Sequence, residues 1–261
     1  MSLYDGPFWL VLFALSALSV ALACGGHVLF RRLVPYKSLV AHNDVAGFTI
    51  AVIGVIYAVL LAFVVIVVWE QYNDSDSRYG DEVAAMADLD AYARLLPLRE
   101  GDTLRSMVRH YVRLMIVEEW PAMLGGGESR AATQVLADIG ATIESYHARN
   151  GQETMVQLRL LEELRAASDD RQRRLSDNQN TLPLVMWVAL IAGAAVTIGF
   201  GYLFGVQNFR AQLAMTASVA LLIAFSFTIL IELDYPFRRD SAIPVDRWQF
   251  LQHSLGRLSA R

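Results

Sequence analysis

The sequence has almost no cysteine, because Cys24 is the only one in 261 residues. An intrachain disulfide is therefore impossible, and zinc sites built from several cysteines are excluded. The five histidines are scattered along the chain without the spacing of metal ligands. No Gly-rich phosphate loop, GxSxG motif or HExxH motif occurs. We therefore expect no enzyme activity, no catalytic residue, and no bound metal or cofactor.

Charge is also scarce. Only 18% of the residues are charged, against about 25% in soluble proteins, whereas 55% are hydrophobic and the mean hydropathy is +0.36. This composition is typical of a membrane protein. The charges divide unevenly, because residues 70–181 carry a net −7 and the remainder a net +3. A nucleic-acid partner is not expected, since no net basic domain is available to neutralise phosphates.

Four long apolar runs account for the hydropathy, and none contains a charged residue: 8–30, 45–68, 182–204 and 211–231. A helix needs about 20 residues to cross a bilayer. The first run lacks a basic start and exceeds the length of a signal-peptide core, so we expect a retained helix. Between the second and third runs, apolar residues recur at helical spacing, and no segment alternates like a strand. The sequence predicts an all-α integral membrane protein with four transmembrane helices and a helical soluble domain inserted between the second and third.

The predicted domains follow from these runs. Residues 1–69 form a first transmembrane hairpin, 70–181 the helical soluble domain, 182–233 a second transmembrane hairpin, and 234–261 a C-terminal tail with an amphipathic helix. Four crossings put both termini and the soluble domain on one face of the membrane. Seven arginines lie near membrane ends on that face, against four basic residues on the other. The positive-inside rule therefore favours a cytosolic soluble domain.

The chain is organised around the apolar run at 45–68. Asn43 or Asp44 can cap the start of its helix, and Trp69 and Tyr72 are the residue types that lie at the headgroup level. Small residues follow one side of the helix at spacings of three or four, namely Gly47, Ala51, Gly54, Ala58 and Ala62. Such a stripe lets neighbouring helices approach closely, so we expect this helix to pack against protein.

Several short motifs carry a resemblance to a known family. They are His42-Asn43-Asp44, Gly54-Val55, residues 57–61, Trp69-Glu70-Gln71-Tyr72, Glu119-Trp120-Pro121 and Pro236-Phe237-Arg238. The chain resembles the bacterial bestrophin-like domain family of unknown function over about residues 40–240, and it departs from the pattern at Tyr235. The resemblance implies a multi-pass protein of the bacterial inner (plasma) membrane. The likeness to bestrophins implies an oligomeric anion channel with four membrane helices per subunit and a cytosolic domain.

Two functional hypotheses follow. The first is a homo-oligomeric ion channel in the lipid bilayer, with the 45–68 helix lining or bordering the pore and inorganic ions as its partners. Thr49, Tyr57 and the backbone would line the path, or Ile56 and Phe63 would gate it by dewetting. Rings of Glu70 and Asp74 would favour cations, whereas the resemblance implies anions, so ion selectivity is left open. The second hypothesis is a non-conducting signalling or scaffold protein whose helical domain docks a partner.

Three other patterns have a structural and a functional interpretation. Asp74, Asp76 and Glu82 could hold calcium, but a solvated helix start is the simpler interpretation. Arg105, Arg109 and Arg113 share one helix face and could bind an anion, although pairing with nearby acids is more common. His42 with Asp44 could form a proton-sensitive pair, whereas capping is the simpler role for Asn43 and Asp44.

Overall fold

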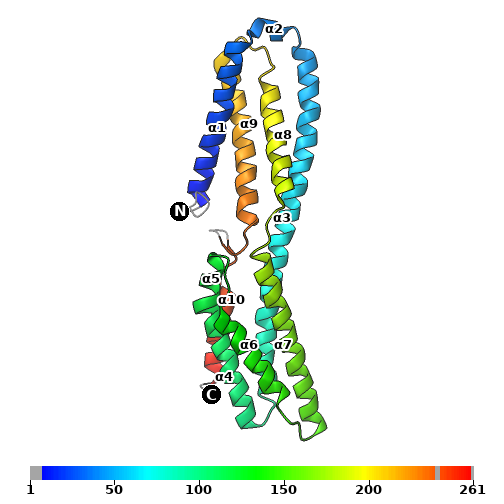
Figure 1. Cartoon of the computed structure of the whole chain (residues 1–261), viewed down its shortest axis with the longest axis vertical. Coiled ribbons are helices and arrows are strands. Elements are labelled where there is room, and N and C mark those ends of the chain that lie inside the picture. Colours follow the sequence, from blue (N-terminus) through cyan, green and yellow to red (C-terminus); the bar gives the residue numbers. More distant parts are fainter. Residues whose placement is uncertain (1–7, 239–241, 260–261) are drawn as a thin grey trace. The chain divides into compact units, whose positions relative to one another are not determined.

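The computed structural model describes residues 8–238 and 242–259, and over these residues the chain is all-helical (Figure 1). This confirms the all-α part of the predicted fold class. The elements in chain order are α1 (Phe8–Leu33), α2 (Tyr36–Val40), α3 (Asn43–Ala93), α4 (Leu98–Leu114), the π-helical segment η2 (Met115–Glu119), α5 (Trp120–Leu124), α6 (Arg130–Glu144), α7 (Gly151–Asp177), α8 (Leu184–Gly201), α9 (Phe209–Leu233) and α10 (Asp246–Ser259). Four of them, α1, α3, α8 and α9, are long and apolar enough to cross a membrane.

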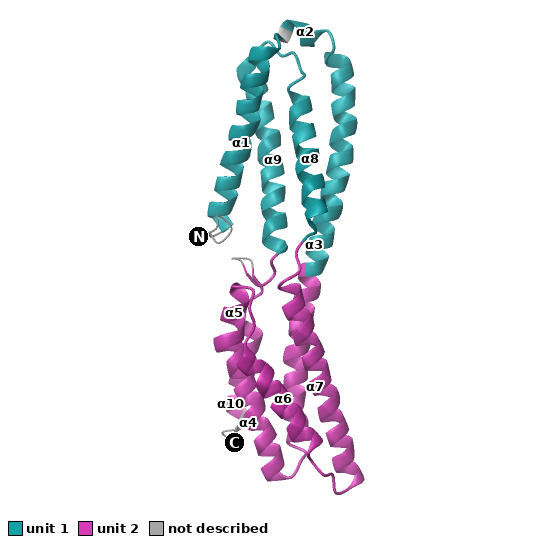
Figure 2. Cartoon of the chain, viewed as in Figure 1, with its two compact units in different colours: residues 1–71, 182–234, 239–241 teal, residues 72–181, 235–238, 242–261 magenta. Residues whose placement is uncertain are grey.

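The chain divides into two compact units (Figure 2). Unit 1 comprises residues 1–71, 182–234 and 239–241, and unit 2 comprises 72–181, 235–238 and 242–261. From Tyr235 on, the described part of the C-terminal tail therefore belongs to unit 2, where α10 supplies the buried side chains of Trp248, Leu251 and Leu255.

Unit 1 is a bundle of apolar helices. The helix α1 runs beside α9, and α8 contacts both. The first half of α3 joins them through two small cores: one contains Val64, Val68, Leu182, Leu190 and Leu230, and the other contains Tyr57, Ala194 and Ile223. In three of the four apolar windows only 11% of the residues are buried. Most of the apolar surface of unit 1 is thus left for lipid or for another protein to cover.

Unit 2 has a larger core, built around aromatic rings. Trp248 lies 6.3 Å from Tyr79 and 6.0 Å from Tyr111 between ring centroids, and its backbone N–H donates to the Tyr79 hydroxyl at 3.1 Å. Trp120 completes the group at 4.8 Å from Tyr79. Burial raises the pKa of Tyr79 to about 12. These contacts tie α3, α4, α5 and α10 together.

The helix α3 is longer than the sequence suggests. The domain boundary predicted at residues 69 and 70 falls inside one helix of 51 residues. Asn73, Asp74 and Ser75 are poor helix formers, yet the helix continues through them. Tertiary contacts explain this, because Ser75 Oγ donates to Asp177 at 3.0 Å, and Arg78 Nη1 donates to the same carboxylate at 2.8 Å.

The helical backbone continues past Trp120 and Pro121. The chain passes from α4 through η2 into α5, where Pro121 occupies the second helical position. A proline removes an N–H and crowds the carbonyl four residues earlier, which breaks a regular α-helix. The wider π turn at residues 115–119 adjusts the backbone just before the proline and places the Glu119 side chain in the interior.

Candidate functional site

The start of α3 is held by Asn43. Its Oδ1 accepts from the backbone N–H of Gly205 at 2.9 Å, and its Nδ2 donates to the Gly205 carbonyl at 3.1 Å. Helix capping by Asn43 is therefore wrong, because both ends of its amide bind the loop between α8 and α9. The carbonyl of His42 accepts the first helical hydrogen bond, from Ala46. The His42 and Asp44 side chains are both exposed, and no hydrogen bond joins them in the described structure.

The stripe of small residues on α3 is not covered within the chain. None of Gly47, Ala51, Gly54, Ala58 and Ala62 is buried. A Cβ atom added at Gly47 or Gly54 would meet nothing within 4 Å. The expected packing of this stripe therefore requires a second molecule. The close helix approach within unit 1 lies elsewhere, at Gly193 of α8, where an added Cβ would collide with the Tyr57 ring.

Four of the predicted pore residues share one face of α3. Thr49, Ile56, Phe63 and Glu70 are seven residues apart, and an α-helix drifts by only about 20° per seven residues. Ile56 and Phe63 are each 65% exposed, Glu70 is exposed and Thr49 is half-buried. The Thr49 hydroxyl donates to the Val45 carbonyl at 2.9 Å. We call these four residues the Thr49–Glu70 face.

Tyr57, another predicted pore residue in the apolar run, lies elsewhere. Its side chain is in the core of unit 1, only 7% exposed, beside Ala194 and Ile223. It therefore does not belong to the surface that carries Ile56 and Phe63.

Acidic residues follow this face along α3. Glu70 is exposed. Asp74 is 67% exposed and lies 3.7 Å from Arg78, but Arg78 makes its shorter contact with Asp177. Arg78 is thus engaged by two aspartates. Trp69 is 54% exposed and Tyr72 is half-buried.

The suggested calcium ligands do not converge. Asp76 binds Arg247 at 2.8 Å, and Glu82 is fully buried against Arg174. Among the residues that the structure describes, no group of three or more His, Cys, Asp or Glu side chains is placed to hold a metal ion. The three arginines on α4 are not all available to an anion, since Arg105 pairs with Asp90 at 3.4 Å and with Asp102 at 3.2 Å.

A buried charge network fixes the interior of unit 2. Arg174 Nε donates to Glu82 at 2.6 Å, and its Nη2 donates to Glu119 at 3.2 Å. Arg171 donates through two nitrogens to the two oxygens of Glu119, at 2.9 and 3.0 Å. The Tyr111 hydroxyl donates to Glu82 at 3.0 Å. The two arginines and two glutamates neutralise each other and connect α3, α4, η2 and α7.

Burial and charge together set the protonation of this network. Burial alone would lower the pKa of Arg174, but Glu82 and Glu119 outweigh that effect and raise it. Burial and the adjacent Glu82 hold the pKa of Tyr111 well above its usual value. Sequence reasoning missed the network. The only sequence signals were the motif position of Glu119 and two arginines three residues apart on one helix.

Comparison with known proteins decides the family. A family model of the bestrophin-like domain matches residues 17–247. The chain belongs to the bestrophin-like family. Solved structures agree, although the sequence identities are low. A bacterial bestrophin homologue from Klebsiella pneumoniae is 14% identical with a TM-score of 0.66, covering 94% of this chain and 98% of that one.

Two further structures give similar values. A point-substituted form of the Klebsiella pneumoniae bestrophin homologue has a TM-score of 0.69 at 12% identity, covering 96% of this chain and 99% of that one. A structure described as a membrane protein has a TM-score of 0.70 at 14% identity, covering 95% and 98%. No curated protein matches the chain. The bestrophin-like chain therefore shares its fold with bacterial bestrophin homologues over nearly its whole length.

Proposed function

We propose that this bestrophin-like protein is an oligomeric ion channel and that the 45–68 segment of α3 borders its pore. The single observation that supports this most strongly is the combination of the family fold with an exposed Thr49–Glu70 face. An apolar helix face that ends in a carboxylate is suited to a constriction that gates by dewetting, with a charged mouth at one end.

Self-association supplies the partner for α3. In one chain the small stripe and many large apolar side chains of α3 are uncovered, including Phe48 at 75% and Val55 at 64% exposure. Lipid can cover large apolar side chains, but a stripe of small residues favours close contact with another helix. We therefore assign the small stripe to the interface between copies and the Thr49–Glu70 face to the central axis.

The sign of the permeating ion follows from Glu70 in this proposal. Copies around an axis would place a ring of carboxylates at the end of the apolar constriction, and such a ring concentrates cations and repels anions. Asp74 extends the negative region, four residues further along α3. We place the protein in the bacterial inner membrane with unit 2 in the cytosol, on the count of basic residues near the membrane ends.

The experiment is a planar-bilayer recording of the purified full-length protein. The proposal expects discrete, salt-dependent conductance that scales with the amount of incorporated protein. A protein that incorporates as a folded oligomer but gives no conductance over a range of voltage and salt would contradict the channel. The result would instead favour the non-conducting signalling or scaffold protein.

A further inference from the structure

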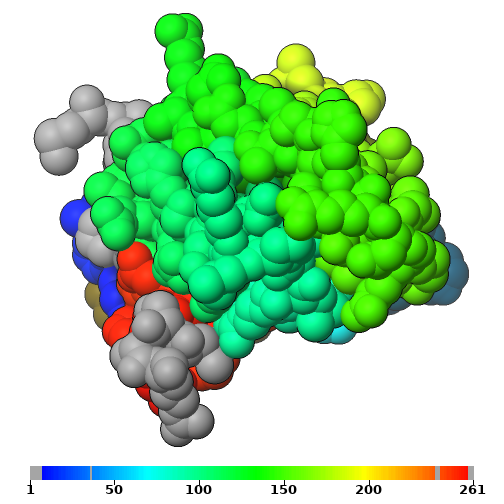
Figure 3. All heavy atoms as spheres, turned by 90° about the horizontal axis from the view of Figure 1, so that it is seen from below, coloured from blue at the N-terminus to red at the C-terminus, as the bar shows by residue number. Residues whose placement is uncertain are grey.

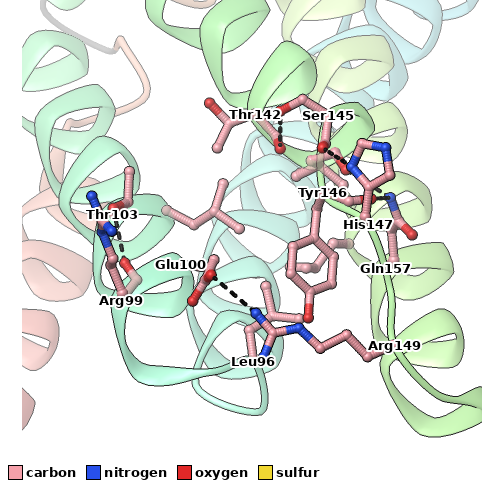
Figure 4. Close-up of a pocket in the computed structure, with 13 residues that line it drawn as sticks. Leu96, Arg99, Glu100, Thr103, Thr142, Ser145, Tyr146, His147, Arg149 and Gln157 are labelled. Carbon is pink, nitrogen blue, oxygen red and sulfur yellow. Dashed lines mark hydrogen bonds and ion pairs between the residues drawn. The ribbon is translucent and has the colours of Figure 1, made fainter.

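Unit 2 contains a cavity of about 410 Å³ that the channel proposal does not use. It lies between the first turn of α4, the end of α6, the loop at residues 145–150 and the start of α7 (Figure 4). In the space-filling view of Figure 3, the blue-green surface of the start of α4 and the green surface near residue 150 lie close together. The residues that line the cavity come from segments some 40 positions apart, so no local sequence motif indicates the cavity.

The floor of the cavity is apolar. Its lining includes four aliphatic side chains that are at most 6% exposed: Leu96, Leu104, Ile143 and Leu160. An apolar group that enters the cavity leaves water and contacts these side chains. Transfer of that kind is favourable by roughly 25 cal/mol for each Å² of apolar surface removed from water.

The rim of the cavity carries opposite charges side by side. Arg149 Nη2 lies 3.9 Å from Glu100 Oε1, with the two side chains 70% and 37% exposed. An exposed pair at that separation contributes little to stability, so both groups remain available to a ligand. Figure 4 shows the Arg149 side chain reaching across the mouth toward Glu100.

The loop that carries Arg149 is already ordered. Glu153 Oε2 accepts from the Tyr146 hydroxyl at 2.7 Å and from the Arg149 backbone N–H at 2.8 Å. Gln157 Nε2 donates to the carbonyls of Ile143 and Tyr146, both at 2.8 Å. A ligand therefore meets a loop whose conformation is fixed in advance, which lowers the entropy lost on binding.

We propose that this cavity binds a free α-amino acid with an apolar side chain. One carbon separates the carboxylate and the ammonium of such a ligand, which matches a guanidinium and a carboxylate side by side on the rim. Arg149 holds the α-carboxylate through its planar fork, Glu100 accepts from the α-ammonium, and the side chain lies on the aliphatic floor. Arg99 also lines the cavity. A simple anion fits less well than an amino acid, because it brings no cationic group to the Glu100 carboxylate.

The test is isothermal titration of the full-length protein in detergent with L-leucine. One saturable site per chain is expected. Arg149→Gln and Glu100→Gln are each expected to weaken binding at least about tenfold, as for loss of one charge-assisted contact. Arg159→Gln is the matched control, because Arg159 is an exposed arginine of the same unit that pairs with Glu162 outside the cavity lining. Leucine should bind this control unchanged.

Two ligand analogues separate the amino acid from its alternatives. Leucine amide lacks the carboxylate and N-acetyl-leucine lacks the ammonium, so both are expected to bind at least about tenfold more weakly than leucine. Absence of saturable binding by leucine and phenylalanine in the folded protein would overturn the proposal. Equal binding of N-acetyl-leucine, or an unaltered affinity in Arg149→Gln, would also overturn it. The test is independent of whether the protein conducts ions.

Discussion

Arg174 and Glu82 form an ion pair of 2.6 Å in which neither side chain is exposed to solvent. They are 92 residues apart in the chain and join α7 to α3. A buried charge is tolerated only when its partners satisfy it, because the unpaired ion would lose its hydration without compensation. The packing of α7 against α3 therefore depends on both residues.

The first prediction concerns this pair. Arg174→Met leaves Glu82 as a buried carboxylate without its main partner and should destabilise the protein by about 3–5 kcal/mol. The double variant Glu82→Leu/Arg174→Met should recover part of that loss, because it removes both charges. Denaturant unfolding followed by tryptophan fluorescence measures both, with Arg159→Met as an exposed control. A double variant less stable than Arg174→Met would contradict the assignment.

The second prediction separates contacts within the chain from contacts between copies. Gly193→Leu should destabilise the single chain by about 1–3 kcal/mol, since its side chain would displace the Tyr57 ring. A Cβ atom added at Gly54 meets nothing within 4 Å, so Gly54→Leu should change the oligomeric mass while the fold persists. Light scattering in detergent together with thermal unfolding checks both. If Gly54→Leu left the assembly unchanged, the small stripe would face lipid.

The third prediction addresses the start of α3. Asn43→Asp keeps the acceptor but loses the donor to the Gly205 carbonyl and places a negative charge beside that oxygen. We expect a loss of about 1–3 kcal/mol in the unfolding free energy. Asp44→Asn serves as the control, because Asp44 is exposed on the next position. Equal stability of the two variants would show that the link to Gly205 contributes nothing.

The fourth prediction concerns pH and the loop at residues 145–150. The hydrogen bond from Tyr146 and the backbone N–H of Arg149 lower the pKa of Glu153 below its usual value. A carboxylate with a lowered pKa stabilises the folded loop above its ordinary pKa, and this contribution is lost as the pH falls through the lowered value. Tyr146→Phe removes the largest cause, so the pKa of Glu153 should rise toward normal. Carbon-13 NMR titration of the Glu153 carboxyl measures this pKa. An identical titration curve in wild type and Tyr146→Phe would show that the Tyr146 hydroxyl does not lower the pKa of Glu153.

The fifth prediction concerns topology. A reporter fused after Gly126 should show cytoplasmic activity, because the basic residues near the membrane ends favour a cytosolic unit 2. A paired phosphatase and fluorescent-protein fusion distinguishes the two sides. Phosphatase activity in the periplasm would reverse the assignment.

Local patterns in the sequence predicted most of the helices, because apolar runs and helical spacing are properties of neighbouring residues. The continuity of α3 was not predictable in this way, since Asn73 and Ser75 favour a break and Asp177, about 100 residues away, holds the helix together. The bond between Asn43 and Gly205, 162 residues apart, was missed for the same reason. The Glu82–Arg174 pair required charges from two distant helices, and no motif marks the cavity in unit 2.

The predicted pore residues differ in their exposure, and the sequence alone did not show which of them are buried. Tyr57 and Ile56 are neighbours in an uninterrupted apolar run, yet Tyr57 is 7% exposed and Ile56 is 65% exposed. Taken over its whole length, α3 has little amphipathic character, so its sequence does not indicate which side of the helix faces protein. Only the contacts with α8 and α9 reveal that side.

The most direct test of the channel account is the reversal potential of purified protein in a planar bilayer under a salt gradient, comparing wild type with Glu70→Gln. A ring of carboxylates acts over about one Debye length, ~8 Å at physiological salt, so its effect should be greater at low salt. We predict a cation-selective reversal potential that shifts toward zero in Glu70→Gln, more at low than at high salt. Asp74→Asn should shift it less, and Glu162→Gln on α7 should leave it unchanged. An unaltered reversal potential in Glu70→Gln, with conductance intact, would contradict the placement of Glu70 at the pore.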